Sequence, residues 1–393
     1  MNYKHIFFLI SYASIILGNS STFIAIYWII GKSGSASFLA TTVAFVFLIR
    51  FIVSSLLSKY IDKYNHINIY IHIFILRVLI ILITVFLIYS FNQYIVQFLF
   101  ILTLLLNSLD VVSNTIMPKF IKGFGDKVLV KMNSYISIIE KSFYVFGMLL
   151  GTVLITLFNV QIILLIEGVL YLLSLLLINL IKNYLNILTA NASVKSDSDL
   201  YREKSNLITH IVVIAVSANI MITPYTTLII PFIKKVFGNK PLLFSTTELS
   251  IMAGSILVGI FISYINSDND QRYNKIFIIS ALLQGVVILA LNLNSEILIY
   301  HFLLVILGLC ITSFNIPLSV LLQKNIGMNK LGGAKAKIVS ISTIFSSLSY
   351  FISAIMIKYV SINIVFIIFP VIGISILVLY LVIGGKNGVS TFS

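Results

Sequence analysis

Apolar stretches of about twenty residues recur along the whole 393-residue chain, separated by short polar breaks. A helix rises 1.5 Å per residue, so each stretch is long enough to cross the roughly 30 Å hydrocarbon core of a bilayer. The stretches that we expect to span the membrane are 5–30, 37–58, 68–90, 94–117, 134–158, 160–182, 207–233, 242–265, 275–293, 296–322, 335–360 and 362–384. The sequence therefore predicts an all-α polytopic membrane protein with twelve transmembrane helices, and we expect the first stretch to stay attached as its first helix.

The composition argues against a soluble enzyme. The chain is 59% hydrophobic and 10% charged, whereas soluble domains are about 45–50% apolar and about 25% charged. Cys310 is the single cysteine, so neither an intramolecular disulfide nor a metal cluster built from cysteines can form. The phosphate-binding pattern G-x-x-x-x-G-K-[ST] does not occur, so the chain carries no P-loop ATPase of its own. We expect no enzymatic activity, no cofactor and no metal site.

The most polar part of the chain lies between the sixth and seventh predicted spans. It divides the chain into an N-terminal six-helix bundle over 1–181, a cytoplasmic linker over 182–206 and a C-terminal six-helix bundle over 207–393. The halves show a faint internal repeat of loop lengths, as in transporters built from two related bundles.

The basic residues predict the orientation of the chain, because Lys and Arg near span ends resist translocation. With both termini inside, eighteen Lys and Arg residues lie on the cytoplasmic side, five lie outside and three fall within spans. We therefore expect a multi-pass protein of the cytoplasmic membrane, monomeric in the lipid bilayer, with both termini in the cytoplasm. This topology accounts for most of the net charge of +14, so the charge does not point to a nucleic-acid partner.

Ionisable residues inside the predicted spans are the first candidates for function. The first half contains six of them, three basic and three acidic: Arg50, Arg77, Asp110, Glu140, Lys141 and Glu167. A charge at the centre of a spanning helix costs at least about 2.5–3.5 kcal/mol, so we expect these residues to face the interior and to pair. The first five lie at a similar depth, which predicts one network, with Glu167 nearer the outer side and separate from it. A purely structural network that holds helices in register is the alternative.

A polar stripe on the fourth span favours Asp110 as the proton-coupling residue. Asn107, Asp110 and Asn114 recur at i, i+3 and i+7, which is one face of a helix, and we expect Pro118 to end that helix. Glu140, Glu167 and Glu248 are the other proton-coupling candidates. In the fifth span, Gly147 and Gly151 are typical of close contact between helices.

Several short motifs resemble those of the major facilitator superfamily. After the second span the chain reads Ser58-Lys59-Tyr60-Ile61-Asp62-Lys63-Tyr64-Asn65-His66, which resembles the loop signature G-x-L-x-D-R-x-G-R-K. Other segments match motifs of the same family. In chain order they are Gly31-Lys32-Ser33-Gly34-Ser35-Ala36, Met117-Pro118-Lys119-Phe120-Ile121, Met132-Asn133-Ser134, Gly147-x-x-x-Gly151, Leu322-Gln323 and Ala336-Lys337-Ile338. Together they resemble the macrolide-efflux and enterobactin-exporter-like branch of the superfamily, nearly end to end.

This resemblance implies the major facilitator fold and an alternating-access exporter whose cavity is lined by the first, fourth, seventh and tenth spans. Polar and aromatic residues on these spans are then the substrate-cavity candidates: Asn19, Asn107, Asn114, Asn219, Thr223, Tyr225 and Asn315. The resemblance also implies a role in the cytoplasmic gate for Asp62 and Lys63.

We therefore predict a transporter that exchanges protons for small amphiphilic compounds of the drug or macrolide type. Two alternatives remain open at this point. One is an exporter of an endogenous metabolite such as a siderophore or a peptide. The other is a non-transporting membrane protein that binds a toxin or a partner and confers immunity.

Overall fold

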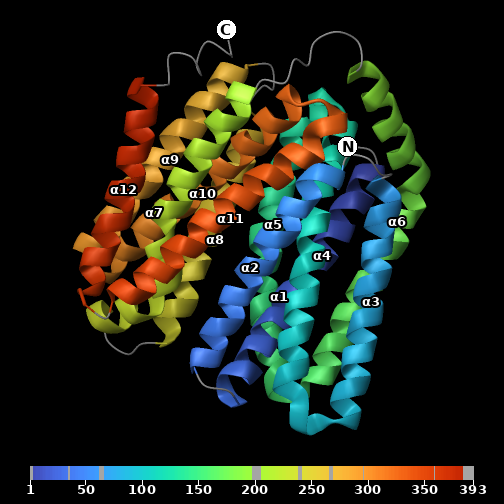
Figure 1. Ribbon diagram of the computed structural model, residues 1–393, viewed down its shortest axis with the longest axis horizontal. Coiled ribbons are helices and arrows are strands. Elements are labelled where there is room, and N and C mark those ends of the chain that lie inside the picture. Colours follow the sequence, from blue (N-terminus) through green and yellow to red (C-terminus); the bar gives the residue numbers. More distant parts are fainter. Residues whose placement is uncertain are drawn as a thin grey trace. The chain divides into compact units, whose positions relative to one another are not determined.

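The computed structural model describes residues 3–33, 36–61, 66–196, 205–237, 241–264, 269–294, 296–357 and 359–383. These residues form twelve α-helices and a short 3-10 helix, η2 (Asn92–Tyr94) (Figure 1). The α-helices are α1 (Tyr3–Ser33), α2 (Ala36–Tyr60), α3 (His66–Ser90), α4 (Ile95–Gly123), α5 (Asp126–Leu157), α6 (Val160–Ser196), α7 (Ser205–Phe237), α8 (Pro241–Ser263), α9 (Asp270–Leu293), α10 (Ile297–Asn325), α11 (Met328–Met356) and α12 (Ile362–Ile383).

The lengths and compositions of these helices confirm the prediction of a helical membrane protein. Within the described residues, ten helices are long and apolar enough to cross a membrane. Shorter apolar segments, Phe45–Leu57 and Leu207–Thr223, lie in α2 and α7. Many large apolar side chains, such as Phe86 and Leu180, are exposed on the surface, as expected for residues that face lipid.

Several helices extend beyond the predicted spans, among them α4, α5 and α6. α4 continues through Pro118 to Gly123, so the expectation that Pro118 ends the helix is wrong. A proline removes one backbone hydrogen bond, and spanning helices tolerate this loss where neighbouring groups satisfy the freed carbonyl. α5 begins at Asp126, ahead of its apolar stretch, and α6 continues to Ser196, into the predicted linker. Between α4 and α5, Gly125 has a φ of 96°, a left-handed conformation that favours glycine.

The chain divides into two compact units. Unit 1 comprises Met1–Phe124, Ile139–Ser198 and Met328–Ala336, and unit 2 comprises Gly125–Ile138, Asp199–Gly327 and Lys337–Ser393. The beginning of α5 therefore groups with unit 2 and the remainder of α5 with unit 1. The beginning of α11 groups with unit 1 and the remainder of α11 with unit 2.

In unit 1, α6 packs on α1, α3 and α4, and α4 also packs on α2 and α3. Small residues allow α1 to lie close to its neighbours. Ser11 of α1 and Ser174 of α6 are buried, with their hydroxyl oxygens 2.6 Å apart. A Cβ added to Gly151 of α5 would lie 2.6 Å from Ile24 Cγ2 of α1, so only glycine fits at this contact.

In unit 2, α10 packs on α8 and α9, while α12 packs on α7 and α9. α8 and α10 approach with their backbones in contact, because a Cβ on Gly254 would lie 2.9 Å from the carbonyl carbon of Val305. At the end of α10, Lys324 Nζ and Asn325 Nδ2 donate to the two carboxylate oxygens of Asp270, at 2.7 and 2.9 Å. This contact ties the start of α9 to the end of α10.

Candidate functional site

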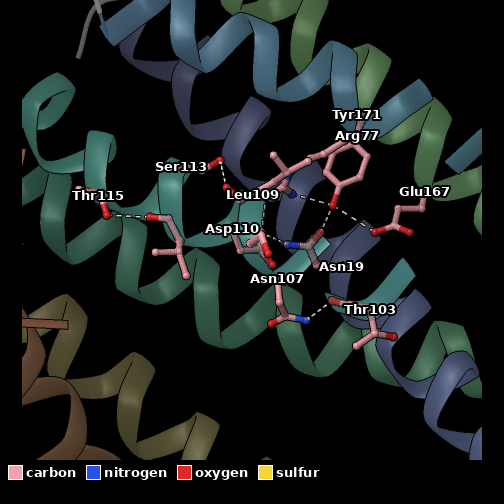
Figure 2. Close-up of polar contacts among 12 residues, drawn as sticks. Asn19, Arg77, Thr103, Asn107, Leu109, Asp110, Ser113, Thr115, Glu167 and Tyr171 are labelled. Atoms are coloured by element: carbon pink, nitrogen blue, oxygen red, sulfur yellow. Dashed lines mark hydrogen bonds and ion pairs between the residues drawn. The ribbon is translucent and has the colours of Figure 1, made fainter. Parts of the chain in front are cut away.

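Four helices of unit 1 bring polar side chains together in their apolar surroundings (Figure 2). α1 contributes Asn19, α3 contributes Arg77, α4 contributes Asp110, and α6 contributes Glu167 and Tyr171. We call these five residues the unit 1 cluster. They meet because α6 packs on α1, α3 and α4, which places side chains from distant parts of the sequence side by side.

Arg77 and Asp110 form an ion pair between Arg77 Nη2 and Asp110 Oδ1. The side chain of Arg77 is 1% exposed and that of Asp110 is 21% exposed. A buried guanidinium without an anion is strongly unfavourable, so the carboxylate of Asp110 accounts for the presence of Arg77 in the middle of α3. The pair links α3 to α4.

The hydroxyl group of Tyr171 lies at the centre of the contacts between α1, α3 and α6. It accepts a hydrogen bond from Arg77 Nη1 at 2.8 Å and is hydrogen-bonded to Asn19 Oδ1. It also lies 3.1 Å from Glu167 Oε1, one turn earlier on α6. The ring of Tyr171 contacts the guanidinium of Arg77, with 5.0 Å between Arg77 Cζ and the ring centroid, a cation–π arrangement.

The side-chain amide of Asn19 closes a ring of contacts. Its Nδ2 donates to Asp110 Oδ1 at 3.3 Å, and its Oδ1 contacts the hydroxyl of Tyr171. Figure 2 shows Asn19 between Asp110 and Tyr171. Asn19 was predicted as a substrate-cavity residue, and the structure places it in contact with the ion pair.

Glu167 is the most enclosed acid of the cluster. Glu167 is 1% exposed, and its carboxyl group interacts with the side chains of Thr22 of α1 and Tyr171 of its own helix. Gly18 of α1 leaves the space for this side chain, because a Cβ on Gly18 would lie 3.3 Å from Glu167 Cγ. The expectation that Glu167 is separate from the charge network is wrong, since Tyr171 connects it directly to Arg77.

Of the three residues of the polar stripe on α4, only Asp110 takes part in the cluster. Asn107 Nδ2 donates to the backbone oxygen of Thr103 on its own helix, at 2.9 Å. Asn114 is exposed. Figure 2 shows the same local pattern for Ser113 and Thr115, whose hydroxyls donate to backbone oxygens of α4.

The structure does not bring the other three predicted network residues into the unit 1 cluster. Arg50 of α2 interacts electrostatically with Tyr27, and its Nε is buried without a hydrogen-bond partner in the described part of the chain. Glu140 of α5 is exposed and interacts electrostatically with Lys335 at the start of α11. Lys141 is half-buried. A shared depth along the helix axes did not predict the contacts, because depth says nothing about the direction in which a side chain points around its helix.

The candidates in unit 2 are dispersed along their helices. Asn219 and Thr223 of α7 donate to backbone oxygens one turn earlier, each at 2.8 Å. Tyr225 is buried and interacts electrostatically with Glu248 of α8, which is half-buried. Asn315 of α10 is exposed.

Asp62 and Lys63, the predicted gate residues, lie outside the described residues. Among the residues that the structure describes, no group of three or more His, Cys, Asp or Glu side chains is placed to hold a metal ion.

Sequence reasoning missed three polar contacts. Tyr171 was not a candidate, although its position four residues after Glu167 places both on one face of α6. Buried Asn133 of α5 donates to Gln323 Oε1 of α10 at 2.6 Å within unit 2. His301 of α10 has its Nδ1 3.0 Å from the hydroxyl of Ser250 of α8. The last two join side chains far apart in the sequence, and no local pattern predicts them.

Comparison with known proteins gives a consistent result for fold and family. The sequence profile of the Major Facilitator Superfamily matches residues 8–354. No curated protein sequence is similar enough to count as a match. Many solved structures are similar to this chain.

Three similar structures are transporters with different named substrates. The human organic anion transporter MFSD10 (TETRAN) is 8% identical, with a TM-score of 0.74 over 95% of this chain and 98% of that chain. A bacterial homologue of the iron transporter ferroportin, in an outward-facing state, is 13% identical, with a TM-score of 0.74 over 97% and 99%. The proton:xylose symporter XylE is 12% identical, with a TM-score of 0.71 over 96% and 95%. At these identities the likeness shows the shared fold.

The all-helical fold, the apolar helices and the match over most of the chain agree with one another. The chain therefore belongs to the Major Facilitator Superfamily, and it is a membrane transporter rather than an enzyme.

Proposed function

We propose that this transporter exports small amphiphilic compounds in exchange for protons, by alternating access, and that the unit 1 cluster is its proton-coupling site. The observation that carries the proposal is the buried contact of Arg77 and Asp110 with Glu167 through Tyr171. Ionisable groups inside a membrane are costly and mark proton or substrate pathways when they are kept. We also propose the cytoplasmic membrane as its location, with both termini in the cytoplasm.

The charges of the cluster favour proton coupling. One basic group, Arg77, faces two acidic groups, Asp110 and Glu167. With both acids ionised the cluster has a net charge of −1, and with one acid protonated it is neutral. Taking up a proton therefore changes the charge of a buried site, which is a large electrostatic change in a medium of low dielectric constant.

An ion gradient is the energy source that fits the sequence, because the chain has no phosphate-binding loop for ATP. Moving one elementary charge through the membrane potential supplies about 2.3 kcal/mol per 100 mV. One or two protons per cycle are therefore enough to drive a substantial solute gradient.

The resemblance of the loop motifs to the macrolide-efflux and enterobactin-exporter-like branch supports export. The similar structures differ widely in their named substrates, which are organic anions, iron and xylose. They support transport of a small molecule. The chemical class of that molecule has to be inferred from the residues of this chain. The candidate cavity residues Asn219, Thr223 and Tyr225 are neutral and partly aromatic, which suits an amphiphilic compound.

The test is transport in inverted membrane vesicles under an imposed pH gradient, with a fluorescent amphiphilic dye and a radiolabelled macrolide as probes. Accumulation that requires the gradient and collapses with a protonophore supports the proposal. Transport of neither probe, together with export of a compound found by untargeted metabolomics of a knockout strain, favours the endogenous-metabolite alternative. Absence of all transport in reconstituted vesicles favours the immunity-protein alternative.

A further inference from the structure

The hydroxyl of Tyr171 contacts two side-chain oxygen atoms, but it has only one hydrogen to donate. It lies 3.1 Å from Glu167 Oε1 and is hydrogen-bonded to Asn19 Oδ1, while it accepts from Arg77 Nη1. A tyrosine hydroxyl donates one hydrogen, and an amide oxygen donates none. If Tyr171 donates to Asn19, the hydrogen in the contact with Glu167 has to come from the carboxyl group of Glu167.

Exchanging the positions of the oxygen and nitrogen of the Asn19 side-chain amide does not supply the missing hydrogen. The Nδ2 of Asn19 donates to Asp110 Oδ1, which already pairs with Arg77. A flipped amide would set its oxygen against this carboxylate, where neither atom has a hydrogen to donate. The orientation of Asn19 is therefore determined by Asp110, and the amide oxygen has to face Tyr171.

The surroundings of Glu167 also favour its neutral form. α3 faces it with Arg77 and α4 with Asp110, and these two already form an ion pair. α1 faces it with the uncharged residues Gly18, Asn19 and Thr22, and its own helix adds Tyr171. No second basic residue among the described residues reaches the cluster. An ionised Glu167 would therefore be a buried negative charge without a positive charge to balance it.

We propose that Glu167, rather than Asp110, carries the exchangeable proton of the unit 1 cluster, and that Tyr171 links this proton to Asn19 of α1. The inference rests on the proposed proton coupling and names the group that performs it. The protonated carboxyl of Glu167 donates to Tyr171, Tyr171 donates to Asn19, and Asn19 donates to Asp110. Every hydrogen bond in this chain then has one donor and one acceptor.

Loss of the proton changes the contacts of α1. The ionised Glu167 has no hydrogen to donate, so the single hydrogen of Tyr171 turns to Glu167 Oε1. Asn19 Oδ1 then loses its donor, and its contact with Tyr171 joins two oxygen atoms without a hydrogen between them. The proton on α6 thus determines whether α1 is held to α6 at this position. This is a switch between two hydrogen-bond patterns that a transport cycle can use.

Infrared difference spectroscopy of the full-length protein in lipid vesicles tests the assignment, because a protonated buried carboxyl has its own C=O band. The variants are Glu167→Gln, which resembles the protonated acid, Asp110→Asn and Tyr171→Phe. Glu296→Gln is the control, since Glu296 is exposed and outside the cluster. We expect the band in wild type and Glu296→Gln, and its loss in Glu167→Gln. Asp110→Asn should lose the band as well, because Glu167 then becomes the acid that balances the charge of Arg77. Tyr171→Phe keeps the acid and removes its partner, so the band should shift without losing intensity.

Transport of the fluorescent dye provides the second readout. Glu167→Gln should lower pH-driven transport at least tenfold while downhill exchange of the dye stays within twofold of wild type. A band that survives in Glu167→Gln overturns the inference. A band that Tyr171→Phe leaves unshifted assigns the proton to Asp110 instead, because the carboxylate of Asp110 is hydrogen-bonded to Arg77 and Asn19 and not to Tyr171. A wild type with the Glu167 band but without pH-driven transport contradicts the proposed function, and the assignment of the proton to Glu167 then stands on the band alone.

Discussion

Arg77 of α3 and Asp110 of α4 form an ion pair in which the base is 1% exposed and the acid is 21% exposed. The pair is therefore asymmetric. About a fifth of the Asp110 side chain is left uncovered by other residues, whereas Arg77 is enclosed by its protein partners. Removing Asp110 should destabilise the protein more than removing Arg77. A buried cation left without an anion costs far more free energy than a partly exposed anion left without a cation.

Asp110→Asn should lower the free energy of unfolding by about 3–5 kcal/mol, since it removes the ion-pair partner of buried Arg77. The double variant Arg77→Met/Asp110→Asn should recover part of the loss, because the buried charge is gone. The measurement is thermal unfolding in detergent with a thiol-reactive dye, for which buried Cys310 is the single reporter. Additive effects of the two substitutions would show that the ion pair has no energetic role.

Tyr171→Phe removes a hydroxyl that contacts Arg77, Asn19 and Glu167. We expect a loss of about 1–3 kcal/mol, the usual cost of leaving buried polar partners unsatisfied. Tyr184→Phe on the same helix is the matched control. Tyr184 contacts Lys4 through its ring, with Nζ 4.1 Å from the centroid, and phenylalanine keeps that contact. Equal melting temperatures for both variants would contradict the central position of the Tyr171 hydroxyl.

Gly151→Ala should destabilise the protein by about 1–3 kcal/mol, because an added methyl group would overlap α1. Its Cβ would lie 2.8 Å from Ser21 Cα, a backbone atom that cannot move away easily. Gly168→Ala is the control on α6, where the nearest atom, Ile81 Cγ2, would be 3.7 Å away. There we expect no loss, or a gain of up to about 1 kcal/mol from the better helix propensity of alanine. Both are measured by the same thiol-dye melting experiment.

Asn133 and Gln323 are buried and hydrogen-bonded to each other within unit 2, and Gln323 Nε2 has no hydrogen-bond partner among the described residues. Asn133→Leu should cost about 1–3 kcal/mol, since both polar atoms of Gln323 are then left unsatisfied. Asn133→Leu/Gln323→Leu should be closer to wild type than the single variant, because the polar atoms are removed together. A double-mutant cycle measures this coupling, and a coupling energy of zero would contradict it.

The positions of the contacts explain which predictions from the sequence succeeded. The twelve apolar stretches match the twelve helices, because the length and polarity of a stretch determine whether it can cross a bilayer. The pairing of Arg77 with an acid follows from the cost of a lone charge in a membrane, and Asp110 is that acid. The extensions of α4, α5 and α6 were not predicted, because polar helical turns at the ends of spans resemble loops in composition.

The sequence by itself determined that this chain is a polytopic helical membrane protein of the major facilitator type, and that its intramembrane charges need partners. The tertiary structure decided which partners they have. Glu167 joins Arg77 through Tyr171, while Arg50 and Glu140, at a depth similar to that of Arg77, lie elsewhere. The reason is geometric. Residue spacing gives the depth of a side chain along its helix, but the neighbour it meets depends on how each helix is rotated and on which helix packs beside it. In this protein those choices follow from close contacts between distant segments, such as α1 against α6.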